Sequence, residues 1–308
     1  MSMNQERSEL GVQEWTALLL LYFVWGSTYL AIRIAIAGIP PLLLVGARYL
    51  IAGVLLAGTM RLLGKPWPTR AEWKAAACIG PLLAAANALV SLAEVTVTSG
   101  LTAVVVASVP LWIALLAGLF GKWPQKGDWV GLGIGLVGVG VLNFGGDLRG
   151  SPMGGVLLVV STWCWALGSV WGRSLPLPRG LMGSGAQMIT GGVFFLTTAF
   201  LHGDRLHALP ARTPLLAFVY LVFAGSIVGF SSYVLLLERV RPTLAASYAY
   251  VNPIVAVVLG GLIADERISP NAIFAMALIL AGVAIVATRK NVPASAPAAA
   301  KVPEAPRS

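Results

Sequence analysis

Long apolar runs separated by short polar connections dominate the pattern of the chain. Runs of about 20 apolar residues can cross the roughly 30 Å hydrocarbon core of a bilayer as helices. The pattern therefore predicts an all-α membrane protein surrounded by the lipid bilayer, with ten transmembrane helices at approximately 15–37, 41–63, 74–95, 98–120, 127–144, 153–173, 182–201, 214–237, 243–264 and 270–288. The polar segment 1–14 precedes these spans, and we expect the Pro- and Ala-rich tail 291–308 to be disordered.

Composition agrees with this interpretation, because 57% of the 308 residues are hydrophobic and only 11% are charged. Soluble domains carry about 25% charged residues. The net charge of +9 is spread through the connections, so we expect no nucleic-acid partner. The sequence contains no Gly-rich phosphate loop, nucleophile elbow or metal-ligand spacing. We therefore expect neither an enzyme nor a cofactor or metal site.

The distribution of basic residues predicts the orientation. With a cytoplasmic N-terminus, fifteen of the 21 Lys and Arg residues fall on the cytoplasmic side, five fall outside and Arg48 lies within a span. Cytoplasmic loops of membrane proteins carry an excess of Lys and Arg. This bias favours a cytoplasmic position for both termini.

An internal repeat divides the chain at about 144–153. Trp25 and Trp165 are 140 residues apart, and five further pairs recur in the same order at separations of 139 to 144: Arg48 and Gln187, Gly53 and Gly192, Glu94 and Glu238, Pro110 and Pro253, Gly138 and Gly282. A five-span unit is odd, so the second copy must enter the membrane from the opposite side. The sequence thus predicts two inverted five-helix repeats, at 15–144 and 153–288, an architecture typical of secondary transporters.

Pro110 and Pro253 each lie near the middle of an apolar span. A proline removes a backbone hydrogen bond and frees a carbonyl one turn earlier. We therefore predict helix kinks at both positions, near the middle of the membrane.

The residues above also resemble those of a known family. The resemblance rests on five segments: Trp25-Gly26-Ser27-Thr28-Tyr29, Ala47-Arg48-Tyr49, Ala93-Glu94 with Ser99-Gly100, the run from Ala103 to Pro110 and the run from Ser247 to Pro253. Together they resemble the EamA family of the drug/metabolite transporter superfamily, in its branch of YedA-like exporters. The resemblance implies ten helices in two inverted repeats and export of small metabolites or drugs. One departure is Gly121-Lys122, where the family often has Gly-Glu, whereas the second repeat keeps Asp265-Glu266.

Charged residues near the ends of the spans are candidates for gating or coupling. We predict an outer cluster of Arg33, Arg48 and Glu94, and an inner counterpart of Arg173, Gln187 and Glu238. The alternative is that these side chains only anchor the helices at the interface. For Glu94, burial would raise the carboxyl pKa and the neighbouring arginines would lower it, and the sequence does not decide between them.

Aromatic and amide side chains deep within the spans are candidates for a substrate cavity. Trp25 and Trp165 lie well inside their spans, where an indole N–H needs a partner. Core packing is the alternative. The predicted cavity residues are Trp25, Tyr29, Asn87, Trp112, Trp165, Tyr233, Tyr250 and Asn252, with Trp163 and Tyr248 as further aromatic candidates.

These patterns predict a secondary transporter that exports small amino-acid-like, aromatic or amphipathic solutes or drugs across the inner membrane of a bacterium by alternating access. Protons are the candidate coupling ion, and either a monomer or a homodimer fits. The alternatives are an importer or exchanger of the same fold, or a non-transporting membrane protein such as a lipid scramblase or an envelope-complex subunit. Gly131, Gly135, Gly138 and Gly140 form a small-residue face that serves close helix packing or a dimer seam.

Overall fold

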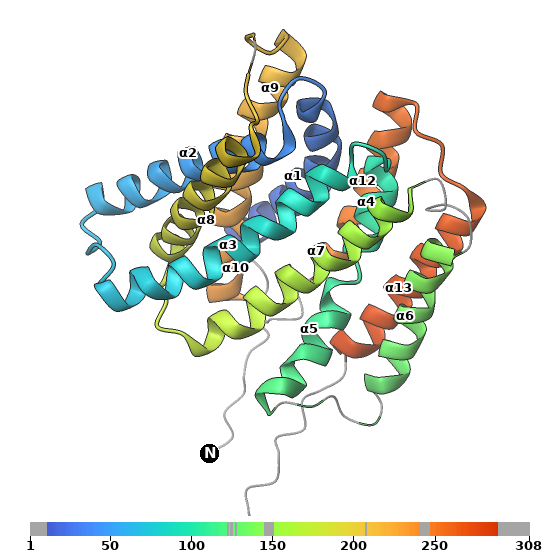
Figure 1. Cartoon of the computed structure of the whole chain (residues 1–308). Helices are drawn as coiled ribbons and strands as arrows, with labels where there is room; N and C mark the ends of the chain where they lie inside the picture. The colour runs from blue at the N-terminus through green and yellow to red at the C-terminus, as the bar shows by residue number, and fades with distance from the viewer. Residues whose placement is uncertain are drawn as a thin grey trace, which may run out of the picture.

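A computed structural model describes residues 11–121, 123, 126, 128–144, 151–206, 208–240 and 247–288. All regular elements among these residues are helical (Figure 1). They are α1 (Val12–Ile36), α2 (Pro41–Leu62), α3 (Arg70–Ala93), α4 (Ser99–Val106), α5 (Val109–Ala117), η1 (Gly118–Phe120), α6 (Asp128–Phe144), α7 (Pro152–Trp171), η2 (Gly172–Ser174), α8 (Gly180–His202), α9 (Arg212–Tyr220), η3 (Leu221–Val228), α10 (Gly229–Arg239), α12 (Tyr248–Ala264) and α13 (Pro270–Thr288). The predicted disorder of 291–308 falls outside the described residues.

Each predicted span overlaps a helical stretch of the described structure, and the starts of the spans 127–144 and 243–264 fall outside the described residues. Seven stretches are long and apolar enough to cross a membrane, and they contain 22 to 28 residues each. The helices α6, α12 and α13 contain shorter apolar stretches, at Asp128–Val141, Val251–Ala264 and Pro270–Ile285. The chain is therefore an all-helical, multi-pass membrane protein.

Local sequence signals set several helix ends. At the start of α3, the Thr69 hydroxyl accepts a hydrogen bond from the Glu72 backbone N–H, and the Glu72 carboxylate accepts one from the Thr69 N–H. This reciprocal capping box satisfies N–H groups that the first turn leaves free. The α8 helix ends at Gly203, whose φ of 92° is a conformation that glycine adopts without steric cost.

The two central prolines have different local structures. At Pro110 the helix is broken into α4 and α5, where our sequence prediction was a kink within one helix. Pro110 lies in the first turn of α5, and the Ser108 hydroxyl donates to the Val105 carbonyl at 2.7 Å, which satisfies a carbonyl at the end of α4. Pro253 lies in the second turn of α12, which continues through it.

A π-helical segment, η3, lies between α9 and α10 and interrupts the predicted span 214–237. The wider turn changes the direction of its side chains and carbonyls relative to an α-helix. Such π-segments within α-helices are frequent at functional sites. The segment places Gly225 and Ser226 toward α1 and α2.

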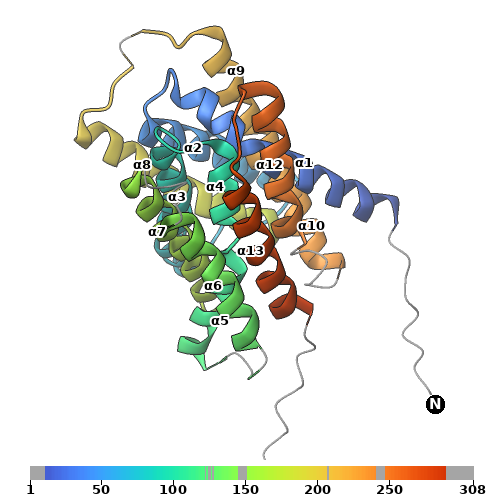
Figure 2. The same ribbon diagram turned by 90° about the vertical axis from the view of Figure 1, so that its right-hand side faces the viewer.

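Glycines bring helices from distant parts of the chain into close contact. The α2 helix packs on α8, α3 on α7 and α8, and α1 on α12 and α10. The α6 and α13 helices lie side by side in both views (Figures 1 and 2). A Cβ atom added to Gly138 would lie 2.9 Å from the Ala275 carbonyl oxygen of α13, and one added to Gly282 would lie 2.5 Å from the Gly131 carbonyl oxygen of α6. Gly135 faces Leu111, so three of the four glycines of the predicted small-residue face, Gly131, Gly135 and Gly138, serve packing within this chain. Gly140 has open space around it.

We expect Gly138→Val to destabilise the bundle, because the new side chain would push against the α13 backbone. Overpacking of this kind costs about 1–3 kcal/mol. Thermal unfolding of the detergent-purified protein should show a lower midpoint. Gly140→Val is the matched control on the same helix and should leave the midpoint unchanged or raise it. Equal midpoints for the two variants would contradict the α6–α13 packing described here.

Candidate functional site

A cavity of about 110 Å³ lies between the two halves of the chain, and we call it the central cavity. A buried water needs roughly 10–15 Å³ on the same measure, so the space is large enough for a small solute. Its wall comes from α1, α2, α3, the α4–α5 break, α7, α10 and α12. Both central prolines line it, together with Trp25, Thr28, Tyr29, Arg48, Tyr49, Asn87, Ser161, Trp165, Phe230, Tyr248 and Asn252.

Trp25 is the centre of an aromatic cluster at this wall. Its ring centroid lies 5.0 Å from that of Tyr248, 5.3 Å from those of Phe230 and Tyr233, and 6.4 Å from that of Trp165. The indole N–H donates to the Gly225 carbonyl of η3 at 3.1 Å. This carbonyl is the partner that an indole at such depth requires.

Neutral polar groups lie between the aromatic rings. The amide of Asn252 faces the backbone carbonyls of Tyr22 and Tyr248, each 3.2 Å away, and its NH₂ group satisfies them. The Ser161 hydroxyl donates to the Ala86 carbonyl at 2.8 Å, which ties α7 to α3. Asn87 donates to Leu83 within its own helix. The wall is thus mainly apolar with a few fixed polar groups, as in most small-molecule sites.

Not all predicted cavity residues lie at the wall. Trp25, Tyr29, Asn87, Trp165 and Asn252 line the cavity. Tyr233 lies behind Trp25 and Tyr248 within the aromatic cluster. Trp112 packs on Trp163 at 5.1 Å between centroids, and its indole N–H donates to Ser108 at 3.1 Å. The side chain of Tyr250 falls outside the described residues.

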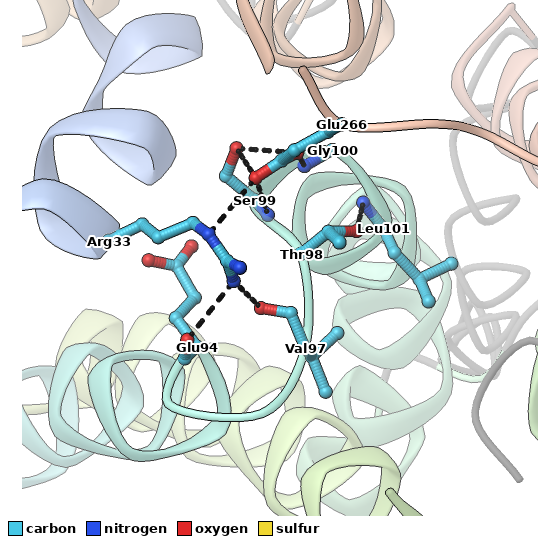
Figure 3. A network of polar contacts seen from close by, with 8 residues as sticks. All are labelled: Arg33, Glu94, Val97, Thr98, Ser99, Gly100, Leu101 and Glu266. Atoms are coloured by element: carbon cyan, nitrogen blue, oxygen red, sulfur yellow. Dashed lines mark hydrogen bonds and ion pairs between the residues drawn. The ribbon is translucent and has the colours of Figure 1, made fainter. Parts of the chain in front are cut away.

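A second polar site, which we call the Arg33–Glu266 cluster, lies where α1, α3 and α12 end and α4 begins (Figure 3). The Glu266 carboxylate accepts hydrogen bonds from the Ser99 N–H, the Ser99 hydroxyl and the Gly100 N–H at 2.9 to 3.0 Å. The Nε atom of Arg33 lies 3.3 Å from Glu266 Oε1, and the same guanidinium donates to the backbone carbonyls of Glu94 and Val97. Glu266 thereby caps α4 and joins the second half of the chain to the first.

Glu94 lies beside Arg33 in this cluster, immediately after the last residue of α3 (Figure 3). It is only 1% exposed, and within the described residues neither carboxylate oxygen has a hydrogen-bond partner. Burial raises the pKa of Glu94 well above its ordinary value of 4.5, the nearby Glu266 charge raises it further, and Arg33 only partly opposes them. The surroundings of Glu94 therefore disfavour its charged form relative to a carboxyl group in water.

The remaining predicted gating residues are dispersed. Arg48 lies at the central cavity and not with Arg33. In the described part of the chain, no ion pair joins Arg173 to Glu238. Gln187 donates to Gly183 within its own helix and lines a smaller cavity of about 40 Å³. His202 pairs with Asp204 at 2.9 Å, and the described residues hold no group of three potential metal ligands.

Sequence reasoning missed several residues of these two sites. Tyr49 and Phe230 separate the central cavity from the smaller one, since both residues line both cavities. Ser226 anchors Arg48, and Glu266 pairs with Arg33. Only Glu266 had a clear signal, as a carboxylate at the end of a central apolar span. The roles of the others depend on the π-helix and on helix packing.

These features define a helical membrane bundle with a central aromatic cavity and a polar cluster at one end. The model of the EamA-like transporter family matches residues 15–144 and 152–288. The chain belongs to this family, which confirms the resemblance seen in the sequence, and membership places it among membrane transporters.

Two relatives and one solved structure show how far the similarity extends. The chain is 42% identical over 288 residues to "Uncharacterized inner membrane transporter YedA" of Escherichia coli K12, and the alignment covers 93% of this chain and 94% of the relative. It is 23% identical over 290 residues to a "Probable amino-acid metabolite efflux pump" of the same strain, covering 87% and 92%. A protein crystal structure with 21% identity has the same fold, with a TM-score of 0.60 over 89% of this chain and 96% of that one.

We expect Glu266→Gln to destabilise the protein, because it removes the negative charge that pairs with Arg33 and accepts hydrogen bonds from the first N–H groups of α4. Hydrogen bonds to charged groups contribute about 1.5–3 kcal/mol. The thermal unfolding midpoint should fall. Asp265→Asn is the control: it removes the adjacent exposed charge and suits the φ of 51° at this position. A midpoint for Glu266→Gln no lower than that of Asp265→Asn would contradict the role of the cluster.

The raised pKa of Glu94 predicts a pH-dependent stability. Between pH 4.5 and the folded-state pKa, the folded protein holds a proton that the unfolded chain has released, so stability should fall as pH rises through this window. One such group contributes a slope of at most about 1.4 kcal/mol per pH unit. Glu94→Gln, which stays neutral, should remove this fall of the unfolding midpoint as the pH rises above 4.5. The exposed Glu238→Gln should retain the wild-type slope, and a wild-type slope in Glu94→Gln would disprove the assignment.

Proposed function

We propose that this protein is a secondary transporter that exports small metabolites across the inner membrane by alternating access through the central cavity. The observation that carries the proposal is the cavity itself. Residues from both halves of the chain line it, and Pro110 and Pro253 lie in its wall. A cavity at the interface between two repeats is where secondary transporters bind their solutes. The name of the relative YedA supports the inner membrane as the location.

The pattern of helix contacts supports the proposed arrangement of ten helices in two inverted repeats. In the predicted repeat, α1 corresponds to α7, α3 to α10, and the α4–α5 region to α12. The contact of α1 with α12 then corresponds to that of α7 with the α4–α5 region, and the contact of α3 with α7 to that of α10 with α1. All four contacts are present. The α2–α8 and α6–α13 contacts map onto themselves. Pseudo-twofold symmetry of this kind is expected of a repeat protein.

The position of the Arg33–Glu266 cluster supports a role in closing one end of the cavity. With both termini in the cytoplasm, as the basic residues favour, the ends of α1, α3 and α12 lie on the outer side. The cluster joins these ends through Arg33, Glu266 and Ser99. In this proposal the described state is closed to the outside.

Glu94 is the proposed proton-binding group. Tyr29 lines the cavity and is near enough to Glu94 for the two groups to interact electrostatically. Loss of the Glu94 proton would place a second negative charge beside Glu266, which also needs Arg33. Competition for one guanidinium would weaken the link to α4 and thereby couple proton movement to opening of the cluster.

The cavity wall also indicates the solutes. Trp25, Trp165 and Phe230 offer apolar faces to aromatic or amphipathic molecules, while Asn87 and Asn252 offer polar contacts. The name of the relative described as an amino-acid metabolite efflux pump supports amino-acid-like solutes. Metabolite accumulation in cells with and without the protein would identify the solute to be used in transport assays.

The direct test is flux of that solute in proteoliposomes made from the purified protein alone. We expect a pH gradient to drive the flux, and Glu94→Gln to reduce the gradient-driven rate at least about tenfold, a typical size for coupling between sites. Solute exchange without a gradient should persist, because the cavity is intact.

Glu238 is an exposed carboxylate at the opposite end of the bundle. Its variant Glu238→Gln is the control and should retain gradient-driven flux. Normal pumping by Glu94→Gln would rule out proton coupling through this residue. Absence of flux for every solute found would favour a non-transporting membrane protein.

A further inference from the structure

Arg48 is one of the residues that line the central cavity. Arg48 lies about two turns from the start of α2, and the residue is only 3% exposed. A charged side chain at such depth is costly and usually faces a cavity or a partner. The contacts of Arg48 show which of these applies.

Two contacts hold the guanidinium in place. Its Nε–H donates to the Ser226 hydroxyl at 2.8 Å, and Ser226 in turn donates to the Leu221 carbonyl of η3 at 3.0 Å. The guanidinium carbon lies 5.5 Å from the centroid of the Tyr49 ring. At Gly225, an added Cβ atom would lie 3.1 Å from Arg48 Nη2, so glycine leaves room for this position. The π-helical segment thus fixes one edge of the guanidinium and leaves its terminal nitrogens for other contacts.

The charge of Arg48 has no acidic partner in the part of the chain that the structure describes. The carboxylates of Glu94 and Glu266 belong to the Arg33–Glu266 cluster. Among the described residues of the cavity wall, Arg48 alone carries a formal charge, and the polar groups Thr28, Asn87, Ser161 and Asn252 are neutral. A buried charge without a partner is strongly unfavourable unless a ligand compensates it.

We propose that Arg48 recognises an anionic group of the solute, so that the transported molecule is a carboxylate, or a similar organic anion, with an aromatic or apolar body. This inference rests on the proposed function and names its substrate class. A guanidinium presents paired N–H groups that match a carboxylate in two parallel hydrogen bonds. Trp25, Trp165 and Phe230 would hold the apolar body. An organic cation, by contrast, would be repelled by the only charge at the wall of the described cavity.

The test uses three probes with one carbon skeleton: 3-phenylpropionate, 3-phenylpropan-1-ol and 3-phenylpropylamine. Calorimetric titration of the full-length protein in detergent measures their dissociation constants. We expect the carboxylate to bind about 10- to 100-fold more tightly than the alcohol, the range that a hydrogen bond to a charged group provides, and the amine to bind most weakly.

Variants assign the preference to Arg48. Arg48→Gln should bind carboxylate and alcohol equally, and Arg48→Lys should keep part of the preference because it keeps the charge without the paired geometry. Ser226→Ala should reduce the preference several-fold, and it keeps the test decisive if Arg48→Gln does not fold. Arg61→Gln is the control, because it removes an exposed charge from the same helix and should bind all three probes as the wild type does.

Three results would overturn the inference: equal wild-type binding of the three probes, tighter binding of the amine, or a carboxylate preference that survives in Arg48→Gln. Titration with chloride and with inorganic phosphate forms a separate arm. If either ion binds as tightly as 3-phenylpropionate and displaces it, Arg48 holds only a small counter-ion and the proposed substrate class is wrong. Carboxylate binding without flux in proteoliposomes would reject transport but retain the anion site, whereas flux of a neutral solute or cation would reject this inference alone.

Discussion

Close approach between helix backbones is the constraint on which the rest of this structure depends. Lipid tails are as apolar as leucine, so apolar contact between helices gains little in a membrane, and association relies on tight packing. Glycines provide that packing where Gly53 and Gly192 bring α2 and α8 together and where Gly138 and Gly282 do the same for α6 and α13. These two close pairs lie on either side of the helices α1, α4 and α12, which together with α2, α3, α7 and α10 line the cavity.

Buried polar groups around that cavity follow from a second requirement, that backbone and side-chain polar groups find partners inside the protein. The segment η3 provides the Gly225 carbonyl for Trp25 and the Ser226 hydroxyl for Arg48. Two groups remain incompletely compensated in the described structure, the charge of Arg48 and the carboxylate of Glu94. They lie at the cavity and at the Arg33–Glu266 cluster, the two sites that our proposal assigns to solute and proton.

Much of the architecture could be predicted from the sequence, because apolar runs of membrane-spanning length leave the chain few alternatives to helices. Such runs gave the positions of the helical stretches, and the motifs around Trp25 and Glu94 gave the family. The break at Pro110 was predicted only as a kink, since a missing N–H does not determine whether local contacts, such as that of the Ser108 hydroxyl with the Val105 carbonyl, will stabilise a complete break.

The sequence by itself thus determined the helices, the family and the position of Trp25 well inside its span, whereas it grouped Arg48 with Arg33 in an outer cluster that the structure does not contain. Only the tertiary structure decided that Arg48 faces the cavity through Ser226 while Arg33 pairs with Glu266, 233 residues away in the chain. The physical reason is that hydrophobicity sets how far a residue lies along a span, whereas its direction depends on which helices pack around it. That packing depends on contacts between distant glycines and on the π-helical segment η3, neither of which the apolar pattern of the chain reveals.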